Sequence, residues 1–253
     1  MKNPLISIIT VVYNSEAYIE KTLKSIKEQT SKNFEYVIID GNSKDGTLSI
    51  IEKYKDCVNV LVSEPDKGLY DAMNKGLENA NGQFVWFINS GDEIFSSDTI
   101  EKIEQYYQQE QDADIFYGQT AIIDLQGNIT GMRRKTAPDN LNPKSLLMGL
   151  VVCHQSILVK REIAPRYNLS YKITADYEWV LSSLEASQKT VNTHLILSRF
   201  LEGGYSSHNV KRSLKDRLTI MIKHFGLFPT IWGHVRITIQ YIKDKLNKDK
   251  DIV

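Results

Sequence analysis

The sequence lacks several features that would place a chain in a specialised class. Two cysteines in 253 residues, Cys57 and Cys153, are too few for a disulfide framework or a structural zinc site, and they are typical of a reducing compartment. No run approaches the roughly 18 apolar residues of a membrane span. The apolar run Leu5–Val12 is too short for a signal peptide and has no cleavage site after it. We therefore expect a chain that starts at Met1 and acts in the cytoplasm.

The formal net charge of the chain is zero, because 31 Lys and Arg balance 31 Asp and Glu. This balance gives no reason to expect a nucleic-acid partner. The charge is unevenly placed, however: residues 211–250 hold ten Lys and Arg against three Asp, whereas residues 1–210 are mildly acidic. The basic tail predicts an anionic partner.

Two common nucleotide-binding motifs are missing. The chain has no G-x-x-x-x-G-K-[ST] sequence and no G-x-G-x-x-G sequence after its first predicted strand. A nucleotide bound here would have to be held by side chains and a metal ion rather than by a glycine-rich loop.

What the sequence does contain is an alternation of short apolar runs and helical patterns. The runs predict strands at Leu5–Val12, Phe34–Ile39, Val58–Val62 and Phe84–Ile88, and the patterns between them predict helices at about 15–29, 45–54 and 68–80. Strand and helix in strict succession predict an α/β fold with a Rossmann-like, mostly parallel sheet.

After residue 92 the pattern changes. Phe116–Asp124 and Asn128–Arg134 predict a hairpin around Gln126–Gly127, followed by strands at Ser156–Val159 and Thr193–Leu197 and a helix at about 174–186. The tail predicts two amphipathic helices separated at Phe228–Pro229. One carries Leu214, Leu218, Met221 or Ile222, and Phe225; the other carries Ile231, Val235, Ile239, Ile242 and Leu246.

Polar residues follow each of the first four predicted strands. In open α/β sheets, ligands bind outside the carboxyl ends of the strands. The segments Tyr13–Asn14, Asp40–Thr47, Ser63–Gly68 and Asn89–Asp92 should therefore meet at one edge. Asp40 and Asp92, each close behind an apolar run, are well placed to bind a ligand.

Five segments in this order resemble the family 2 glycosyltransferases of GT-A fold. They are Ser7–Asn14, Val37–Thr47, Glu64–Gly76, Phe87–Asp92, and the pair Cys153-His154-Gln155 with Ala175–Trp179. The segments Glu64–Gly76, Cys153–Gln155 and Ala175–Trp179 together resemble the bacterial branch that assembles exopolysaccharide of the colanic-acid type, capsule and O-antigen. The resemblance covers about residues 5–205, and it implies a GT-A domain at 1–210, with a nucleotide-binding half at 1–92 and an acceptor half at 93–210. Residues 211–253 then form a separate basic helical tail.

The resemblance also implies roles for the matching positions. Asp176 corresponds to the general base, Asp92 to a carboxylate that binds a divalent cation (Mg²⁺ or Mn²⁺), and Asp40 to the acid that contacts the donor's base. His154 and Gln155 would lie near the acceptor and the leaving diphosphate, and His208 is a further candidate metal ligand. The residues expected to bind the donor are Thr10, Val11, Tyr13, Asn14, Asp40, Asn42, Lys67, Asp71, Asn74, Asn89, Ser90 and Gly91.

The chain departs from the family pattern at two places. Many relatives have two or three aspartates where this chain has Asn89-Ser90-Gly91-Asp92, which weakens the predicted metal site. Many also have an arginine at the position of Met73, so Lys67 is the nearest cation for the donor. One Mg²⁺ ion can still be held by a single carboxylate with phosphates and water.

Each assigned residue also has a purely structural interpretation. Lys67, Asp71 and Asn74 share a predicted helix face that could simply be solvated. An acid at position 176 is favoured by the helix dipole alone. His154 could be a hydrogen-bonded core histidine, and His208 a solvated loop residue.

The tail allows two interpretations as well. Its apolar stripe could close over the catalytic domain, or it could lie on the inner face of the cytoplasmic membrane beside Arg212, Lys215, Arg217, Lys243 and Lys245. The resemblance favours the membrane, because it implies a lipid-linked saccharide acceptor.

The sequence therefore predicts an inverting glycosyltransferase that moves a sugar from a UDP- or GDP-linked donor to such an acceptor in surface polysaccharide synthesis. Two other classes stay open: a catalytically weak nucleotide-sugar-binding subunit, and a nucleotidyltransferase. The second would need a Gly-rich, Arg-containing loop where Tyr13–Glu16 stands.

Overall fold

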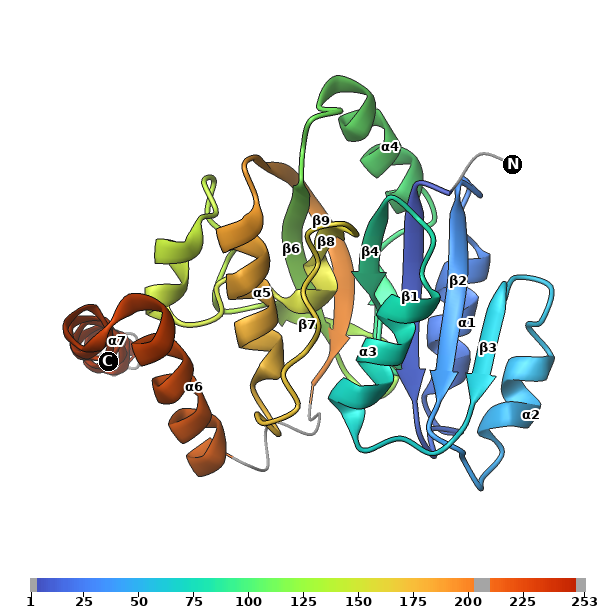
Figure 1. Ribbon diagram of the computed structural model, residues 1–253, viewed down its shortest axis with the longest axis horizontal. Helices are drawn as coiled ribbons and strands as arrows, with labels where there is room; N and C mark the ends of the chain where they lie inside the picture. Colours follow the sequence, from blue (N-terminus) through green and yellow to red (C-terminus); the bar gives the residue numbers. More distant parts are fainter. Residues whose placement is uncertain (1–3, 203–209, 249–253) are drawn as a thin grey trace.

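The computed structural model describes residues 4–202 and 210–248 of the chain. One mixed sheet runs through the molecule in the order β3-β2-β1-β4-β8-β6-β9-β5, with β7 paired to β6 (Figure 1). The strands are β1 (Ile6–Val12), β2 (Phe34–Asp40), β3 (Val60–Ser63), β4 (Phe84–Phe87), β5 (Glu93–Ile94), β6 (Ile115–Ile123), β7 (Ile129–Met132), β8 (Ile157–Lys160) and β9 (Thr190–Leu201).

The first four strands form the parallel part of the sheet. β1 pairs in parallel with both β2 and β4, and β2 pairs in parallel with β3. β1 is buried along its whole length, which explains its continuous apolar run. The other half contains the antiparallel pairs of β8 with β4 and β6, so the predicted mixed α/β sheet is confirmed.

Helices cover both faces of the sheet. α1 (Ile19–Lys27), α2 (Thr47–Glu52) and α4 (Thr99–Gln109) contribute buried residues to one core cluster, with Ile8 and Trp86 from the sheet. α3 (Leu69–Asn79), α5 (Ala175–Ala186) and α6 (Val210–Phe225) contribute to the other, with Ile9 and Phe87. Neighbouring residues of one strand thus face opposite layers. In Figure 1, α3 lies in front of the sheet and α1 behind it.

The tail differs from its prediction in two ways. The break between α6 and α7 (Leu227–Lys248) falls at Gly226, not at Phe228–Pro229. Gly226 has φ +80°, a conformation that ends helices readily in glycine, while Pro229 fits in the first turn of α7, where backbone N–H groups have no helical partner.

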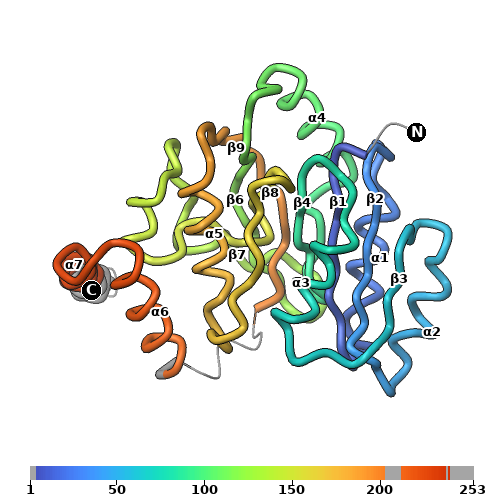
Figure 2. The backbone as a smooth tube through the Cα atoms, viewed as in Figure 1, coloured from blue at the N-terminus to red at the C-terminus, as the bar shows by residue number. Residues whose placement is uncertain are grey.

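The predicted apolar stripe of the tail is mostly exposed. Leu214, Leu218 and Ile222 of α6 face solvent, as do Ile231, Val235 and Ile239 of α7. The buried contacts instead come from Ile220 and Met221, which join the core cluster of α3 and α5. Figure 2 shows α6 and α7 together at the end of the molecule opposite β3 and α2. The division at residue 210 stays a prediction.

Two short 3₁₀ helices lie between β7 and β8: η1 (Pro143–Met148) and η2 (His154–Ser156). The N-terminus of η1 is capped by Asn142, whose side chain accepts from Lys144 N. The segment from η1 to η2 brings His154 and Gln155 under the end of β4, because Trp86 Nε1 donates to Gln155 O at 2.8 Å. None of the helices described is long and apolar enough to span a membrane.

Candidate active site

The loops after β1 and β2 are joined to each other by hydrogen bonds. Asn14 N donates to Ser43 Oγ at 2.8 Å, and Lys44 N donates to Asn14 Oδ1 at 2.9 Å. Asn14 and Asn42 both adopt positive φ, which Asn tolerates better than most residues. These contacts leave Tyr13 on the rim with 60% of its surface exposed.

Asp40 organises this edge from within. The residue is fully buried, and its carboxylate accepts from Ser43 N, Ser43 Oγ and Ser63 Oγ. Through these hydrogen bonds the carboxylate joins the loop after β2 to the end of β3. In this conformation it is therefore not free to make the predicted contact with the donor's base. The assignment of Asp40 as a base ligand remains a prediction.

Asp66 is a second acid at this edge, beside Gly41 and Tyr13. A Cβ on Gly41 would collide with Asp66 Oδ2 and would stand 3.3 Å from the ring of Tyr13. Gly41 therefore lets an exposed aromatic ring and a carboxylate approach the same stretch of backbone. Asp66 belongs to the Glu64–Gly76 segment, and that membership was the only signal for it in the sequence.

Three other predicted donor residues have structural roles in this conformation. Thr10 is buried and its hydroxyl donates to Ile88 O at 2.6 Å. Asn74 is neither solvated nor open to a donor, because its amide bonds to both N and O of Tyr167, at 2.7 and 2.9 Å. Asp71 accepts from Lys67 N at 3.0 Å, which places Lys67 just before α3 rather than within it.

The loop after β4 carries the centre of the site. Asn89 Nδ2 lies 3.1 Å from His154 Nε2, and His154 Nδ1 lies 3.7 Å from Asp176 Oδ2. Since the amide nitrogen donates, Nε2 accepts and the imidazole proton stands on Nδ1, facing Asp176. Burial lowers the pKa of His154 below its usual value, so the ring is neutral at neutral pH.

Asp176 is the exposed member of this chain of contacts. It lies in the first turn of α5 with 24% of its side chain exposed, and its Oδ1 accepts from Tyr177 N at 2.9 Å. Trp179 stacks on Tyr167 at 5.3 Å and meets Phe87 of β4 edge-on at 5.6 Å, which fixes the first turns of α5 against the sheet. The structure thus brings the predicted base, His154 and Asn89 together.

Several buried polar atoms around this centre have no hydrogen-bond partner among the described residues. They are Asn89 Oδ1, Ser90 Oγ and Thr174 Oγ1. Such atoms are costly to bury and are uncommon in native structures. Their grouping around His154 and Asp176 indicates a site built to bind a polar ligand.

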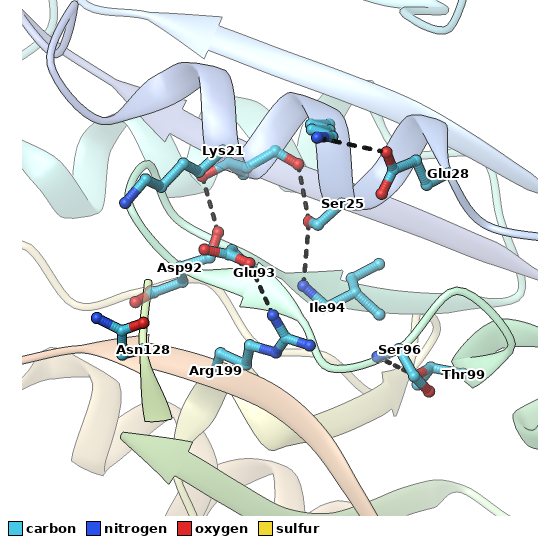
Figure 3. Close-up of polar contacts among 12 residues, drawn as sticks. Lys21, Ser25, Glu28, Asp92, Glu93, Ile94, Ser96, Thr99, Asn128 and Arg199 are labelled. Atoms are coloured by element: carbon cyan, nitrogen blue, oxygen red, sulfur yellow. Dashed lines mark hydrogen bonds and ion pairs between the residues drawn. The ribbon is translucent and has the colours of Figure 1, made fainter. Parts of the chain in front are cut away.

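Asp92 is held as a structural anchor. It is 4% exposed, its Oδ2 accepts from Gln155 Nε2 at 2.7 Å, and its Oδ1 accepts from Leu201 N at 3.0 Å. Burial raises the pKa of its carboxyl to about 7. Figure 3 shows Asp92 beside Glu93, which pairs with Arg199 at 3.3 Å and so joins β5 to β9.

The residues present do not form a metal site as they stand. Among residues 4–202 and 210–248, no three His, Cys, Asp or Glu side chains are grouped so that they could hold an ion. The oxygens of Asp92 already have partners, and His208 lies outside the described residues. The metal role of Asp92 stays a prediction.

The candidate site thus consists of two joined loops at the ends of β1 and β2 and a carboxylate–histidine pair beside the end of β4. Comparison with known proteins identifies the family. The model of glycosyl transferase family 2 matches residues 7–164, and the chain belongs to this family. It is therefore a glycosyltransferase.

Two named relatives are similar along most of their length. The PGL/p-HBAD biosynthesis glycosyltransferase of Mycobacterium bovis (strain BCG / Pasteur 1173P2) is 30% identical over 227 residues, which are 86% of this chain and 85% of that protein. TuaG of Bacillus subtilis (strain 168), a glycosyltransferase assigned to teichuronic acid biosynthesis, is 30% identical over 250 residues, 96% of this chain and 98% of TuaG.

Solved structures agree on the fold. S. aureus TarS 1-349 superimposes with a TM-score of 0.67 at 18% identity, covering 86% of this chain and 65% of that one. The mannosyltransferase PcManGT from Pyrobaculum calidifontis, in complex with GDP-Man and Mn²⁺, gives 0.65 at 16% identity, covering 93% of this chain and 70% of that one. The predicted GT-A fold is confirmed. The chain spans about two thirds of the TarS structure.

The histidine gives a test of how the centre works. We expect His154→Ala to lower kcat by about 10- to 100-fold, because the ring packs 3.7 Å from Asp176 and displacement of a catalytic group by about 1 Å can cost about 10²-fold. Donor affinity should change little, since the ring does not contact the Tyr13–Asn42 loops. Steady-state kinetics and calorimetry with the donor check both. A loss of donor affinity equal to the loss in kcat would contradict a role through Asp176.

Proposed function

We propose that this protein is an inverting glycosyltransferase that transfers a sugar from a UDP- or GDP-linked donor to a hydroxyl of a lipid-linked saccharide. The observation that carries the proposal is the contact chain Asp176–His154–Asn89, with its carboxylate partly exposed. The nucleotide would bind at the joined loops beside Tyr13 and Asp66. Solved TarS in complex with UDP-GlcNAc, and PcManGT with GDP-Man, support a nucleotide sugar as donor.

The proposed reaction is a single displacement. The acceptor oxygen forms a bond to the anomeric carbon while the bond from that carbon to the diphosphate oxygen breaks, and the acceptor proton goes to Asp176 Oδ. His154 Nδ1 lies 3.7 Å from that carboxylate and faces it. One displacement inverts the anomeric configuration and needs no second carboxylate as nucleophile.

Surface polysaccharide synthesis is the proposed context. TuaG is assigned to teichuronic acid biosynthesis, and it aligns with nearly the whole chain. The direct test incubates the protein with UDP- and GDP-sugars and a polyprenyl-diphosphate-linked saccharide, with and without Mn²⁺, and determines the anomeric configuration of the product by NMR. A product that retains the donor's configuration would overturn the mechanism, and no transfer from any donor would overturn the function.

We propose further that α6 and α7 contact the anionic inner face of the cytoplasmic membrane. The exposed stripe of the tail continues into Phe228 and Trp232, which are 83% and 64% exposed. Arg212, Lys215 and Arg236 are exposed on the same two helices. Apolar side chains flanked by cations are typical of helices that lie in a membrane interface.

We expect Phe228→Glu/Trp232→Glu to weaken binding to phosphatidylglycerol-containing vesicles by at least about 10-fold, because burying one large apolar side chain is worth about 1.5–3 kcal/mol. Co-sedimentation measures the effect. The matched control, Leu125→Glu/Ile129→Glu, changes two exposed apolar residues of the β6–β7 hairpin and should bind as the wild type does. Equal losses in both variants would contradict a specific membrane face.

A further inference from the structure

Three cations that the catalytic centre does not use lie close together where β7, η1 and α6 meet. Arg133, Lys135 and Arg217 form this group, called here the basic cluster. Lys135 Nζ donates to Met148 O at 2.6 Å, and Arg133 Nη2 donates to Leu150 O at 2.7 Å. Lys135 Nζ and Arg217 Nη1 both lie within 3.5 Å of the point where a Cβ on Gly149 would stand.

The charge of the basic cluster is not neutralised within the described part of the chain. Enclosure of its ammonium by neighbouring groups lowers the pKa of Lys135 to about 8, although the residue as a whole is exposed, and the positive charges of Arg217, Arg133 and Arg134 act in the same direction. Arg217 Nε is buried without a hydrogen-bond partner. Asp216, its neighbour in sequence, does not pair with Arg217 through its Oδ2, because that oxygen is buried without a hydrogen-bond partner. Crowded like charges of this kind favour a bound anion.

The basic cluster is reachable and lies next to the catalytic centre. Lys135 is exposed, whereas Arg133 and Arg217 are half-buried. The charge of Arg133 acts on His154, and that of Arg217 acts on Tyr177, the residue after Asp176. Tyr177 OH donates to Leu146 O of η1 at 2.8 Å, which ties the start of α5 to the same segment.

On its other side the basic cluster borders the exposed apolar stripe. Arg217 is followed on α6 by exposed Leu218. Gly233 of α7 packs against η1, since a Cβ there would stand 2.8 Å from Leu147 O. The order along this surface is thus apolar stripe, cations, catalytic carboxylate.

We propose that the basic cluster binds the diphosphate that links the acceptor's lipid to its saccharide. This inference rests on the proposed function, because only a lipid-linked acceptor has a chain, a diphosphate and a sugar hydroxyl in that same order. Two guanidinium groups offer paired N–H donors that match phosphate oxygens. Under the proposed function the donor's diphosphate binds elsewhere, at the edge formed by the ends of β1, β2 and β4.

The test measures binding of geranylgeranyl diphosphate to the full chain by calorimetry. We expect Arg133→Gln/Lys135→Gln to bind it at least 100-fold more weakly, since each charged hydrogen bond removed is worth about 10- to 100-fold. UDP affinity should stay within about twofold of the wild-type value. The control Lys53→Gln/Lys144→Gln removes two exposed lysines outside the cluster and should bind both ligands normally. If the double variant does not fold, Lys135→Gln alone, which loses one hydrogen bond to a carbonyl, should still weaken binding about 10-fold.

Three results would overturn the assignment. If the double variant lost affinity equally for UDP and for geranylgeranyl diphosphate, the basic cluster would be part of the donor site. If the wild type bound geranylgeraniol, which has no phosphate, as tightly as geranylgeranyl diphosphate, the protein would not recognise the diphosphate. Unchanged diphosphate binding with reduced binding to phosphatidylglycerol vesicles would assign the cations to the lipid surface.

The same experiments separate this inference from the proposed function. If the double variant transfers sugar with an unchanged KM for the acceptor, the basic cluster does not bind the acceptor's diphosphate, and the proposed function is still supported. If the wild type binds geranylgeranyl diphosphate through the basic cluster but transfers no sugar, the proposed function is contradicted and the diphosphate site is still supported.

Discussion

Asp176→Asn is expected to lower turnover by about 10²- to 10⁴-fold while leaving donor binding near the wild-type value. A positioned general base contributes about this much, and an amide cannot take the acceptor proton. Donor affinity should hold, because Asp176 lies on α5, away from the joined loops at the ends of β1 and β2. Single-turnover kinetics and calorimetry with the donor measure the two quantities separately.

The substitution is close to isosteric, so its effect on folding should be small. Asn can still accept from Tyr177 N, and loss of an acid in the first turn of a helix costs about 0.3–1 kcal/mol. The matched control is Asp139→Asn, an exposed acid of the loop before η1, which should transfer sugar normally. Near-normal turnover in Asp176→Asn would remove this residue from the mechanism. A wild-type protein that binds donor and never transfers it would instead be a binding subunit.

The sequence predicted the parallel half of the fold well. β1, β2 and β4 are buried on both faces, and strands of this kind appear in sequence as unbroken apolar runs. α3 was predicted to within a residue or two, although the structure buries Ala72, Met73 and Gly76 and leaves Leu69, at its start, exposed. Helix α4 was missed, since only Thr99, Ile100 and Ile103 of its eleven residues are buried.

Side-chain partners were harder to predict than elements. The sequence placed Asn74 on a helix face, but its hydrogen bonds go to Tyr167, 93 residues further along the chain. Asp40 was predicted at the ligand-binding edge and is there, yet Ser43 and Ser63 occupy its carboxylate. Distances along the sequence give no information on such partners, whereas strand order gives the edge where they meet.

The basic cluster shows the same limit. Arg133 and Lys135 belong to the end of a predicted hairpin, and Arg217 was assigned to the tail. Only the packing of α7 on η1 and the fold of the 149–153 loop bring these cations together beside His154. A periodic pattern could predict the exposed stripe of the tail, but not which of its charges turn toward the catalytic centre.

Asp92→Asn is expected to stabilise the protein at pH 8 and to leave it little changed at pH 4. The carboxyl of Asp92 has its pKa raised to about 7 by burial, against about 3.9 in an unfolded chain. Between these values the folded state holds a proton that the unfolded state has lost, so stability falls as pH rises from about 4 to 7. The slope is about 1.4 kcal/mol per pH unit, or about 4 kcal/mol in all. Asn does not ionise and can still accept from Leu201 N, so the variant should lack this slope.

Chemical denaturation from pH 4 to 8 measures the effect, with Asp139→Asn as the control that should follow the wild type. A second arm repeats the pH 8 measurement with UDP and Mn²⁺. If Asp92 is an anchor, as its bonds to Gln155 and Leu201 indicate, the ligands should stabilise wild type and variant equally. A cation held by the ionised carboxylate would lower its pKa and stabilise only the wild type at pH 8. That outcome would return Asp92 to the metal-binding role predicted from the family and would require Gln155 to move when the donor binds.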